Sequence, residues 1–325
     1  MRKTLRLIKI NNIHILKLLT MLLLISNSMV AQYRRGFAKH TNIGFGLGTS
    51  SYYGDLAPIN DFISSTSNSL RWNVSMDVSR QITPNIEVGL GFSWIRLGAD
   101  DANSKDSTRF IRNLHFRNDV KEFSIHGRYY LNKVGQNFVK RDDILPFIHV
   151  GFAYYIHNPQ AKSPLLEDND WVDLQPLHTE GQGLNPVYDN PYHLNGIAIQ
   201  AGVGFKKKIN RHMDVSMEAI YRFLFTDYID DVSLNYPNKL FFRDNQLAIA
   251  MARRIDEPIS ARTGIDRIPK LYNLLNAPND LNDELSKYGA TSTNRGTDKG
   301  NDSFFTMTFK IRYLIADRIK CPKIK

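Results

Sequence analysis

The sequence predicts an all-β fold: an eight-stranded antiparallel transmembrane β-barrel of the outer-membrane type, with long extracellular loops. Three observations support this fold, namely an N-terminal export signal, strands with a two-residue period, and connections that alternate between short and long. The 325 residues include only one cysteine, so a disulfide framework and a multi-cysteine metal site are excluded. No segment reaches the roughly 18 apolar residues that a transmembrane helix needs.

Residues 1–31 have the order of a secretory signal peptide. Five basic residues and no acidic one are followed by a short apolar run, 18–25, and by small or neutral residues that end at Ala31. We therefore expect cleavage between Ala31 and Gln32; the alternative is an uncleaved anchor, for which the run is short. Cleavage leaves 37 basic against 32 acidic side chains, a net charge of about +5 instead of +10. The case for a nucleic-acid partner largely disappears with the signal.

The mature chain, 32–325, contains eight segments in which apolar and polar residues alternate. Successive side chains of a strand point to opposite faces, so each segment has one apolar and one polar face. The segments lie near 43–47, 70–82, 86–94, 122–131, 148–157, 197–205, 215–226 and 305–313. Membrane-spanning strands need about nine to eleven residues, whereas average soluble strands have about five or six. The lengths therefore favour strands that span a membrane.

The polar faces carry the charges of these strands. The charged residues are Asp77, Glu87, Glu122, Arg128, Glu218, Arg222, Lys310 and Arg312. Alternation alone does not say which face points outward, and a soluble barrel or sandwich has the reverse orientation. The connections decide in favour of the membrane barrel, because short turns and long loops alternate and, with eight strands, both chain termini fall on the short-turn, periplasmic side. Eight strands enclose just enough space for side chains, so we expect the inward charges to form a structural network; a narrow channel is the alternative.

The apolar face has two features near the ends of its strands. Trp72 and Trp94 lie where an aromatic girdle belongs. Arg80 and Arg96 interrupt the apolar face only near strand ends, where a long side chain reaches the headgroups. Arg96 would either contact lipopolysaccharide phosphate or simply extend into the headgroup region. We therefore expect outer-membrane lipid and lipopolysaccharide to be the immediate partners of the barrel.

Two kinds of residues raise the question of metal binding. The strand register places His126 opposite His149 inside the barrel, either as a metal pair without an evident third ligand or as a hydrogen-bonded pair. Carboxylates gather in one loop, as Glu167, Asp168, Asp170 and Asp173, and again after the seventh strand, as Asp227, Asp230 and Asp231. The first loop lacks the glycine and distal glutamate of an EF-hand, so a solvated loop is favoured over calcium there. We expect no cofactor, no resident metal and no enzyme activity, since no spacing selects a catalytic triad.

Residues 228–302 form the largest connection, which is far longer than a passive hairpin. Helical stretches are indicated at 246–254 and 269–275. A folded lid or partner-binding surface and a simple cover over the barrel mouth are equally compatible with this pattern. The basic tail 318–325 would lie on the periplasmic side, where it either meets a periplasmic partner or is solvated.

Two motifs carry a family resemblance. Ser51-Tyr52-Tyr53-Gly54-Asp55-Leu56 ends the first strand, and Thr226-Asp227-Tyr228-Ile229-Asp230-Asp231-Val232 follows the seventh. With the signal peptide and the Thr83-Pro84-Asn85 turn, the chain resembles the PorG-like outer-membrane barrels of Bacteroidota. The resemblance implies an eight-stranded barrel without catalytic residues. It also implies that Tyr52, Tyr53, Gly54, Asp55, Asp227, Tyr228, Asp230 and Asp231 are structural residues at the barrel rim.

The same resemblance implies a role in the type IX secretion machinery. There the barrel would anchor a periplasmic ring lipoprotein and its partner at the outer membrane. Many relatives in this group have no known role, so a second function class stays open. It is a stand-alone surface barrel that serves adhesion or ligand binding through its long loops.

Overall fold

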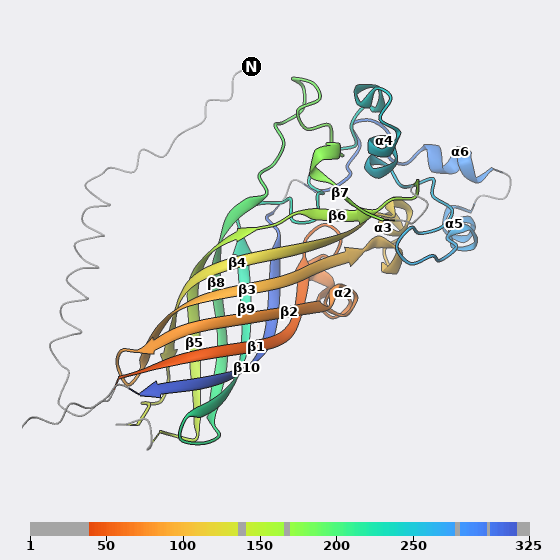
Figure 1. Cartoon of the computed structure of the whole chain (residues 1–325). Helices are drawn as coiled ribbons and strands as arrows, with labels where there is room; N and C mark the ends of the chain where they lie inside the picture. Colours follow the sequence, from red (N-terminus) through yellow and green to blue (C-terminus); the bar gives the residue numbers. More distant parts are fainter. Residues whose placement is uncertain (1–38, 136–140, 166–169, 277–279, 298–299, 317–325) are drawn as a thin grey trace, which may run out of the picture. The chain divides into compact units, whose positions relative to one another are not determined.

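The computed structural model describes residues 39–135, 141–165, 170–276, 280–297 and 300–316 (Figure 1). The chain divides into the units Met1–Phe37 and Ala38–Lys325, of which only the second is described. The predicted signal peptide with its cleavage site and the basic tail 318–325 therefore lie outside the described residues.

Eight long strands form one antiparallel sheet that closes on itself. Around the wall the order is β3, β2, β1, β10, β9, β8, β5, β4, and β4 pairs again with β3. The strands are β1 His40–Tyr53, β2 Arg71–Gln81, β3 Ile86–Asp100, β4 His115–Tyr130, β5 Ile144–Ile156, β8 Asn195–Lys208, β9 Met213–Leu224 and β10 Ser303–Ala316. The predicted eight-stranded antiparallel barrel is therefore confirmed. The structure also has two short strands that the sequence did not indicate, β6 Pro159–Lys162 and β7 Trp171–Asp173. β6 pairs with Arg117 and Asn118 at the long-loop end of β4, and β7 pairs with β6.

The connections alternate in length as predicted. Residues 82–85, 131–143 and 209–212 make the shorter ones, and 54–70, 101–114, 157–194 and 225–302 make the longer ones. His40 at the start of β1 pairs with Ala316 at the end of β10. The first strand therefore begins, and the last strand ends, at the short-turn end of the barrel.

The longer connections contain all the helical segments of the described chain, gathered at one end of the barrel (Figure 1). They are η1 Ile59–Asp61, α2 Phe62–Ser69, η2 Asp101–Asn103, α3 Ser107–Arg112, η3 Gln175–Leu177, η4 Lys239–Phe242, α4 Gln246–Ala252, α5 Ile268–Leu275 and α6 Leu281–Ser286. The helical stretches predicted near 246–254 and 269–275 are confirmed as α4 and α5. No helix in the described ranges has the length and apolar character needed to cross a membrane.

The apolar face of the strands points outward. Leu47, Leu90, Ile125 and Phe152 are each more than 60% exposed, although they lie in the middle of long strands. Soluble monomers rarely expose a contiguous apolar patch of more than a few hundred Å², because hydration of that surface is unfavourable. A belt of this kind around a closed barrel is the surface that contacts lipid, and the soluble alternative is therefore wrong.

The polar face lines the lumen and forms a network of ion pairs. Glu218 accepts from Arg312 at 2.6 Å and lies 2.9 Å from the Lys310 ammonium, and Glu87 accepts from Arg128 at 2.7 Å. Asp77 and Lys206 join the same group of charges. The side chains of all these residues are at most 8% exposed. The network fills the barrel, as predicted for eight strands.

The two lumen histidines lie close together, as predicted, although the register pairs His126 with Gly151 and His149 with Arg128. The rings of His126 and His149 stack with their centroids 5.0 Å apart, and His149 Nε2 lies 3.2 Å from Gln200 Oε1. Stacking thus takes the place of the hydrogen bond expected between the two rings. No group of three or more His, Cys, Asp and Glu residues in the described ranges is arranged to hold a metal ion.

The connection 225–302, whose described residues we call the cap, is folded and also covers the barrel mouth. Ile229 and Val232 of the cap are buried in one apolar cluster with Tyr52, Phe116 and Phe304 of the barrel wall. A second cluster joins the cap to the connection 101–114; its members are Phe110, Ile111, Tyr236, Ile255, Leu271, Leu281 and Leu285. The cap is therefore a folded cover over the mouth, and the partner-binding surface that the sequence also allowed stays a prediction.

Candidate functional site at the barrel rim

The two sequence motifs meet at the rim of the barrel mouth. Tyr52 is an inward residue near the end of β1, and its hydroxyl lies 2.6 Å from Asp230 Oδ2 and 2.6 Å from Asp302 Oδ1. We call Tyr52, Asp230 and Asp302 the rim clasp; all three are almost fully buried. The clasp joins residues that are 178 and 250 positions apart in the sequence. Asp302, which precedes β10, carried no signal that sequence reasoning recognised.

In the rim clasp, two carboxyl groups lie on either side of one tyrosine hydroxyl, which has a single proton to donate. Burial, followed by the charges of Asp302 and Asp55, raises the pKa of Asp230 well above its ordinary value. Burial is also the largest cause of the raised pKa of Asp302. No described cation forms an ion pair with either carboxylate. A proton on one of the two carboxyls therefore removes the repulsion and lets the hydroxyl bond to both.

Gly54 and Asp55 of the first motif hold the chain around the clasp. A Cβ on Gly54 would overlap the Tyr52 hydroxyl and Asp302 Oδ1, so only glycine leaves room for the clasp. Asp55 accepts hydrogen bonds from the Thr297 backbone N–H and, at 2.5 Å, from its hydroxyl. Tyr53 points outward instead, where its hydroxyl lies 2.7 Å from Thr66 of α2.

Asp231 of the second motif ties the cap to the connection 157–194. Its backbone has a φ of +68°, a left-handed conformation that aspartate adopts more readily than most residues. Its carboxylate accepts from the Thr179 hydroxyl at 2.5 Å and from the Tyr192 hydroxyl at 2.7 Å, and it pairs with Arg295 at 3.5 Å. Burial raises the pKa of Asp231, and the charge of Arg295 opposes this rise.

The remaining motif residues belong to the same rim. The ring of Tyr228 stacks on Tyr192 with a centroid distance of 4.6 Å. Asp227 is near enough for its charge to contribute to the raised pKa of Asp230 and Asp302. Asp230 and Asp231 engage different partners on different segments, so they do not converge in the way that the calcium hypothesis required.

The acidic loop of the sequence analysis is partly a strand. Asp173 lies in β7, and its carboxylate accepts a hydrogen bond from the Gln160 side chain at 2.7 Å. The Asp170 backbone carbonyl accepts from the Ser163 N–H at 3.1 Å. Glu167 and Asp168 lie outside the described residues. Pairing of β7 with β6 orders the chain at this end of the segment, where Asp170 and Asp173 stay exposed to solvent, as expected for a solvated acidic segment.

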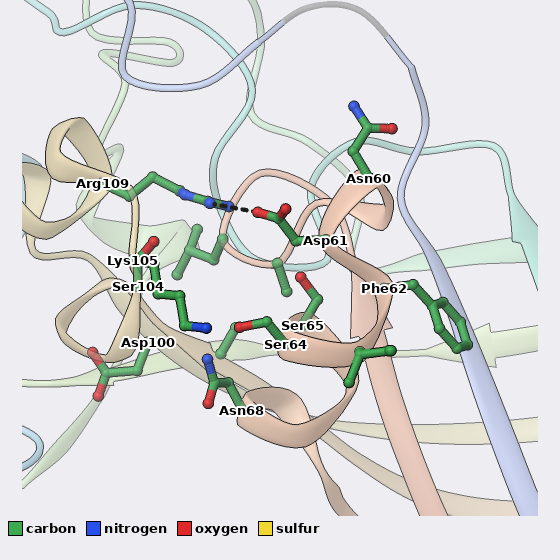
Figure 2. Close-up of a pocket in the computed structure, with 14 residues that line it drawn as sticks. Asn60, Asp61, Phe62, Ser64, Ser65, Asn68, Asp100, Ser104, Lys105 and Arg109 are labelled. Atoms are coloured by element: carbon green, nitrogen blue, oxygen red, sulfur yellow. Dashed lines mark hydrogen bonds and ion pairs between the residues drawn. The ribbon is translucent and has the colours of Figure 1, made fainter.

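Besides a hollow of about 780 Å³ at the rim, which Tyr53, Gly54, Asp55 and Asp227 help to line, two hollows open between the long loops of the described chain. One of about 450 Å³ lies between α2 and the segment 99–109, and Figure 2 shows the Asp61–Arg109 ion pair of 3.3 Å across it. A larger one of about 1070 Å³ lies in the cap, with Leu240, Ile249 and Arg253 in its lining. Sequence reasoning predicted neither, because each is made by segments that are distant in the sequence.

Comparisons with known proteins give one family match and several structural similarities. Residues 16–172 match the family described as "Domain of unknown function (DUF6089)". No curated protein matches the chain. Among solved structures, the N-terminal β-barrel domain of OprF from Pseudomonas aeruginosa is 8% identical, with 86% of this chain and 100% of that chain covered and a TM-score of 0.34.

Two further structures are similar at the same level. Neisserial surface protein A is 5% identical, with 84% of this chain and 96% of that one covered and a TM-score of 0.35. The outer membrane protein OprG from Pseudomonas aeruginosa is 8% identical, with 87% and 98% covered and a TM-score of 0.33. The closed antiparallel sheet, the exposed apolar belt and the filled lumen make the described chain an eight-stranded β-barrel of the outer-membrane type.

Proposed function

We propose that this protein is a structural barrel of the type IX secretion machinery that anchors a periplasmic ring lipoprotein and its partner at the outer membrane. The proposal places the mature chain in the outer membrane after cleavage near Ala31. It assigns the protein neither a catalytic role nor a cofactor. The motif resemblance is its starting point, and the rim clasp gives those motif residues a physical role in holding barrel and cap together.

The filled lumen is the observation that supports an anchor most directly. Buried ion pairs occupy the interior, and the cap residues Ile229 and Val232 pack into the mouth. We infer that a barrel occupied in this way serves as a structural element rather than as a channel. Its remaining surfaces are the lipid belt, the cap and the short-turn end, at which β1 begins and β10 ends.

A site-specific crosslinking experiment in cells tests the proposal. A photoreactive residue replaces exposed Lys133 in the short-turn connection 131–143, and a matched one replaces Leu240, which is 76% exposed in the cap. We expect the ring lipoprotein to be captured from position 133 and not from position 240. Deletion of the gene should also block export of secreted proteins. Capture from neither position, together with normal export, would refute the anchoring role.

A stand-alone surface barrel is the second candidate. The folded cap with its hollow of about 1070 Å³ favours it, because a simple cover needs no such surface. In that case position 240 captures extracellular or surface partners, position 133 captures no ring protein, and removal of the cap affects only surface phenotypes. A narrow channel would instead give steady single-channel conductance in planar bilayers.

A further inference from the structure

The outer wall of the barrel changes character from apolar to cationic along β3 and β4. The register pairs Phe92 with Phe123, then Trp94 with Lys121, then Arg96 with Asp119, then Gly98 with Arg117. Each step of two residues advances about 7 Å along a strand, which is about 5 Å of height for a strand tilted by roughly 40°. The side chains of these positions point outward, as the exposure of Trp94, Phe123 and Lys121 shows.

The tryptophan pair marks where the apolar belt ends. Trp72 and Trp94 contact each other edge to face with centroids 5.4 Å apart on the outer surface. Aromatic girdles of this kind sit at the level of the lipid headgroups. Lys121 therefore lies at the level of the headgroups, and Arg96 and Arg117 lie about 5 Å and about 10 Å above it.

The patch formed by Arg96, Arg117, Lys121 and Asp119 has an excess of positive charge. Arg96 binds Asp119 with two hydrogen bonds of 2.7 Å and lies 5.0 Å from the centroid of the Trp72 ring. Arg117 lies over the Trp171 ring at 4.1 Å and donates to Gln160. In the described parts of the chain, no carboxylate forms an ion pair with Arg117 or Lys121. Within the patch, one acidic group thus faces three cations, and two of these, Arg96 and Arg117, are held by aromatic and hydrogen-bond contacts.

We propose that this patch binds the phosphate groups of an acidic glycolipid in the outer leaflet, the headgroup chemistry of lipopolysaccharide. Phosphate suits the patch because a guanidinium and an ammonium offer directed donors to its oxygens, and the nearby tryptophan rings contact the sugar and the upper acyl chains. The occupant is lipid rather than a soluble anion, because the patch is continuous with the lipid belt at Phe92 and Phe123. The inference rests only on the place of the barrel in the outer membrane and not on its role in secretion.

Native mass spectrometry of the purified full chain in detergent tests this site. The probes are bis-phosphorylated lipid A, the same lipid A without phosphates, and inorganic phosphate. We expect retention of the phosphorylated lipid alone, reduced about fivefold by Lys121→Gln and further by Lys121→Glu, and restored by Lys121→Arg. Lys207→Glu is the matched control, since Lys207 is an exposed lysine near the end of β8, at the short-turn end of the barrel and therefore opposite the patch.

The outcomes separate the site from folding and from secretion. Each variant is first checked for the heat-dependent gel shift of a folded barrel, so that loss of binding is not loss of fold. Equal retention of lipid A with and without phosphates, an equal loss in Lys207→Glu, or full competition by inorganic phosphate would overturn the proposal. Capture of the ring lipoprotein from position 133 should be the same in Lys121→Glu and the unchanged protein, so either proposal can fail alone.

Discussion

Inside the barrel each buried carboxylate faces buried cations, whereas at the rim the carboxyl groups of Asp230 and Asp302 face each other across one hydroxyl. In the lumen, opposite charges compensate for the hydration that both lost on burial. At the rim, a bound proton does the same, because the raised pKa of both groups favours the neutral acid. From this difference we expect the barrel wall to depend on complete ion pairs and the docking of the cap to depend on pH.

The largest effect is expected from breaking the lumen network. Glu218→Leu removes the carboxylate that faces Arg128, Lys310 and Arg312, and leaves three buried cations with less negative charge. Removal of one partner of a buried ion pair costs about 3–5 kcal/mol. Urea unfolding of the purified barrel in lipid vesicles should show this loss, and Glu284→Gln at the cap surface should change the unfolding free energy by less than about 1 kcal/mol. Equal stability of the two variants would contradict the role given to the network.

The next effect concerns the rim alone. Gly54→Ala forces a methyl group into the space of the Tyr52 hydroxyl and Asp302, which should weaken cap docking by about 1–3 kcal/mol. We expect faster hydrogen exchange in residues 225–235 and an unchanged unfolding midpoint of the barrel. Gly127→Ala is the control, because the nearest atoms to its Cβ are 4.0 Å away. Unchanged exchange in Gly54→Ala would show that the clasp does not hold the cap.

A change of pH should sharpen the contrast between the two regions. Asp230 and Asp302 have a raised pKa in the folded protein, so their contribution to docking is complete below the ordinary aspartate pKa of about 3.9 and is lost as pH rises through the raised values. Hydrogen exchange of residues 225–235, corrected for its intrinsic pH dependence, should therefore accelerate from pH 5 to pH 9. Exchange in the strands should not. Equal pH responses in cap and strands would remove the distinction.

The smallest effect is expected from Asp302→Asn. The amide oxygen can accept from the Ile229 N–H, as Asp302 Oδ2 does, while the amide nitrogen donates to the Tyr52 oxygen. Tyr52 then donates to Asp230 without a second negative charge nearby. The variant should keep the cap docked at pH 9 and flatten the pH dependence. A variant as pH-sensitive as the unchanged protein would show that the proton resides elsewhere.

The strands were predictable because their information is local. In segments such as 70–82, alternation divided the side chains between two faces, and the connections indicated that the apolar face meets lipid. A closed barrel of eight strands follows from the number of strands and their connections. The motif residues Tyr52, Asp230 and Asp231 were recognised as rim residues, and the structure places them there. Their partners Asp302, Thr179 and Arg295 were not recognised, because no periodic pattern connects residues that meet only when three loops fold together.

The sequence by itself determined a barrel with an apolar exterior, a charged lumen and long loops at one end. Its two-residue period is a property of every extended chain, so it is readable without knowing any long-range contact. Only the tertiary structure decided that the longest loop folds into a cap, that Gly54 leaves room for a shared hydroxyl, and that cations gather above Trp72 and Trp94. These features arise from side chains that are far apart in the sequence, and the register and packing that bring them together are set by the free energy of the whole fold.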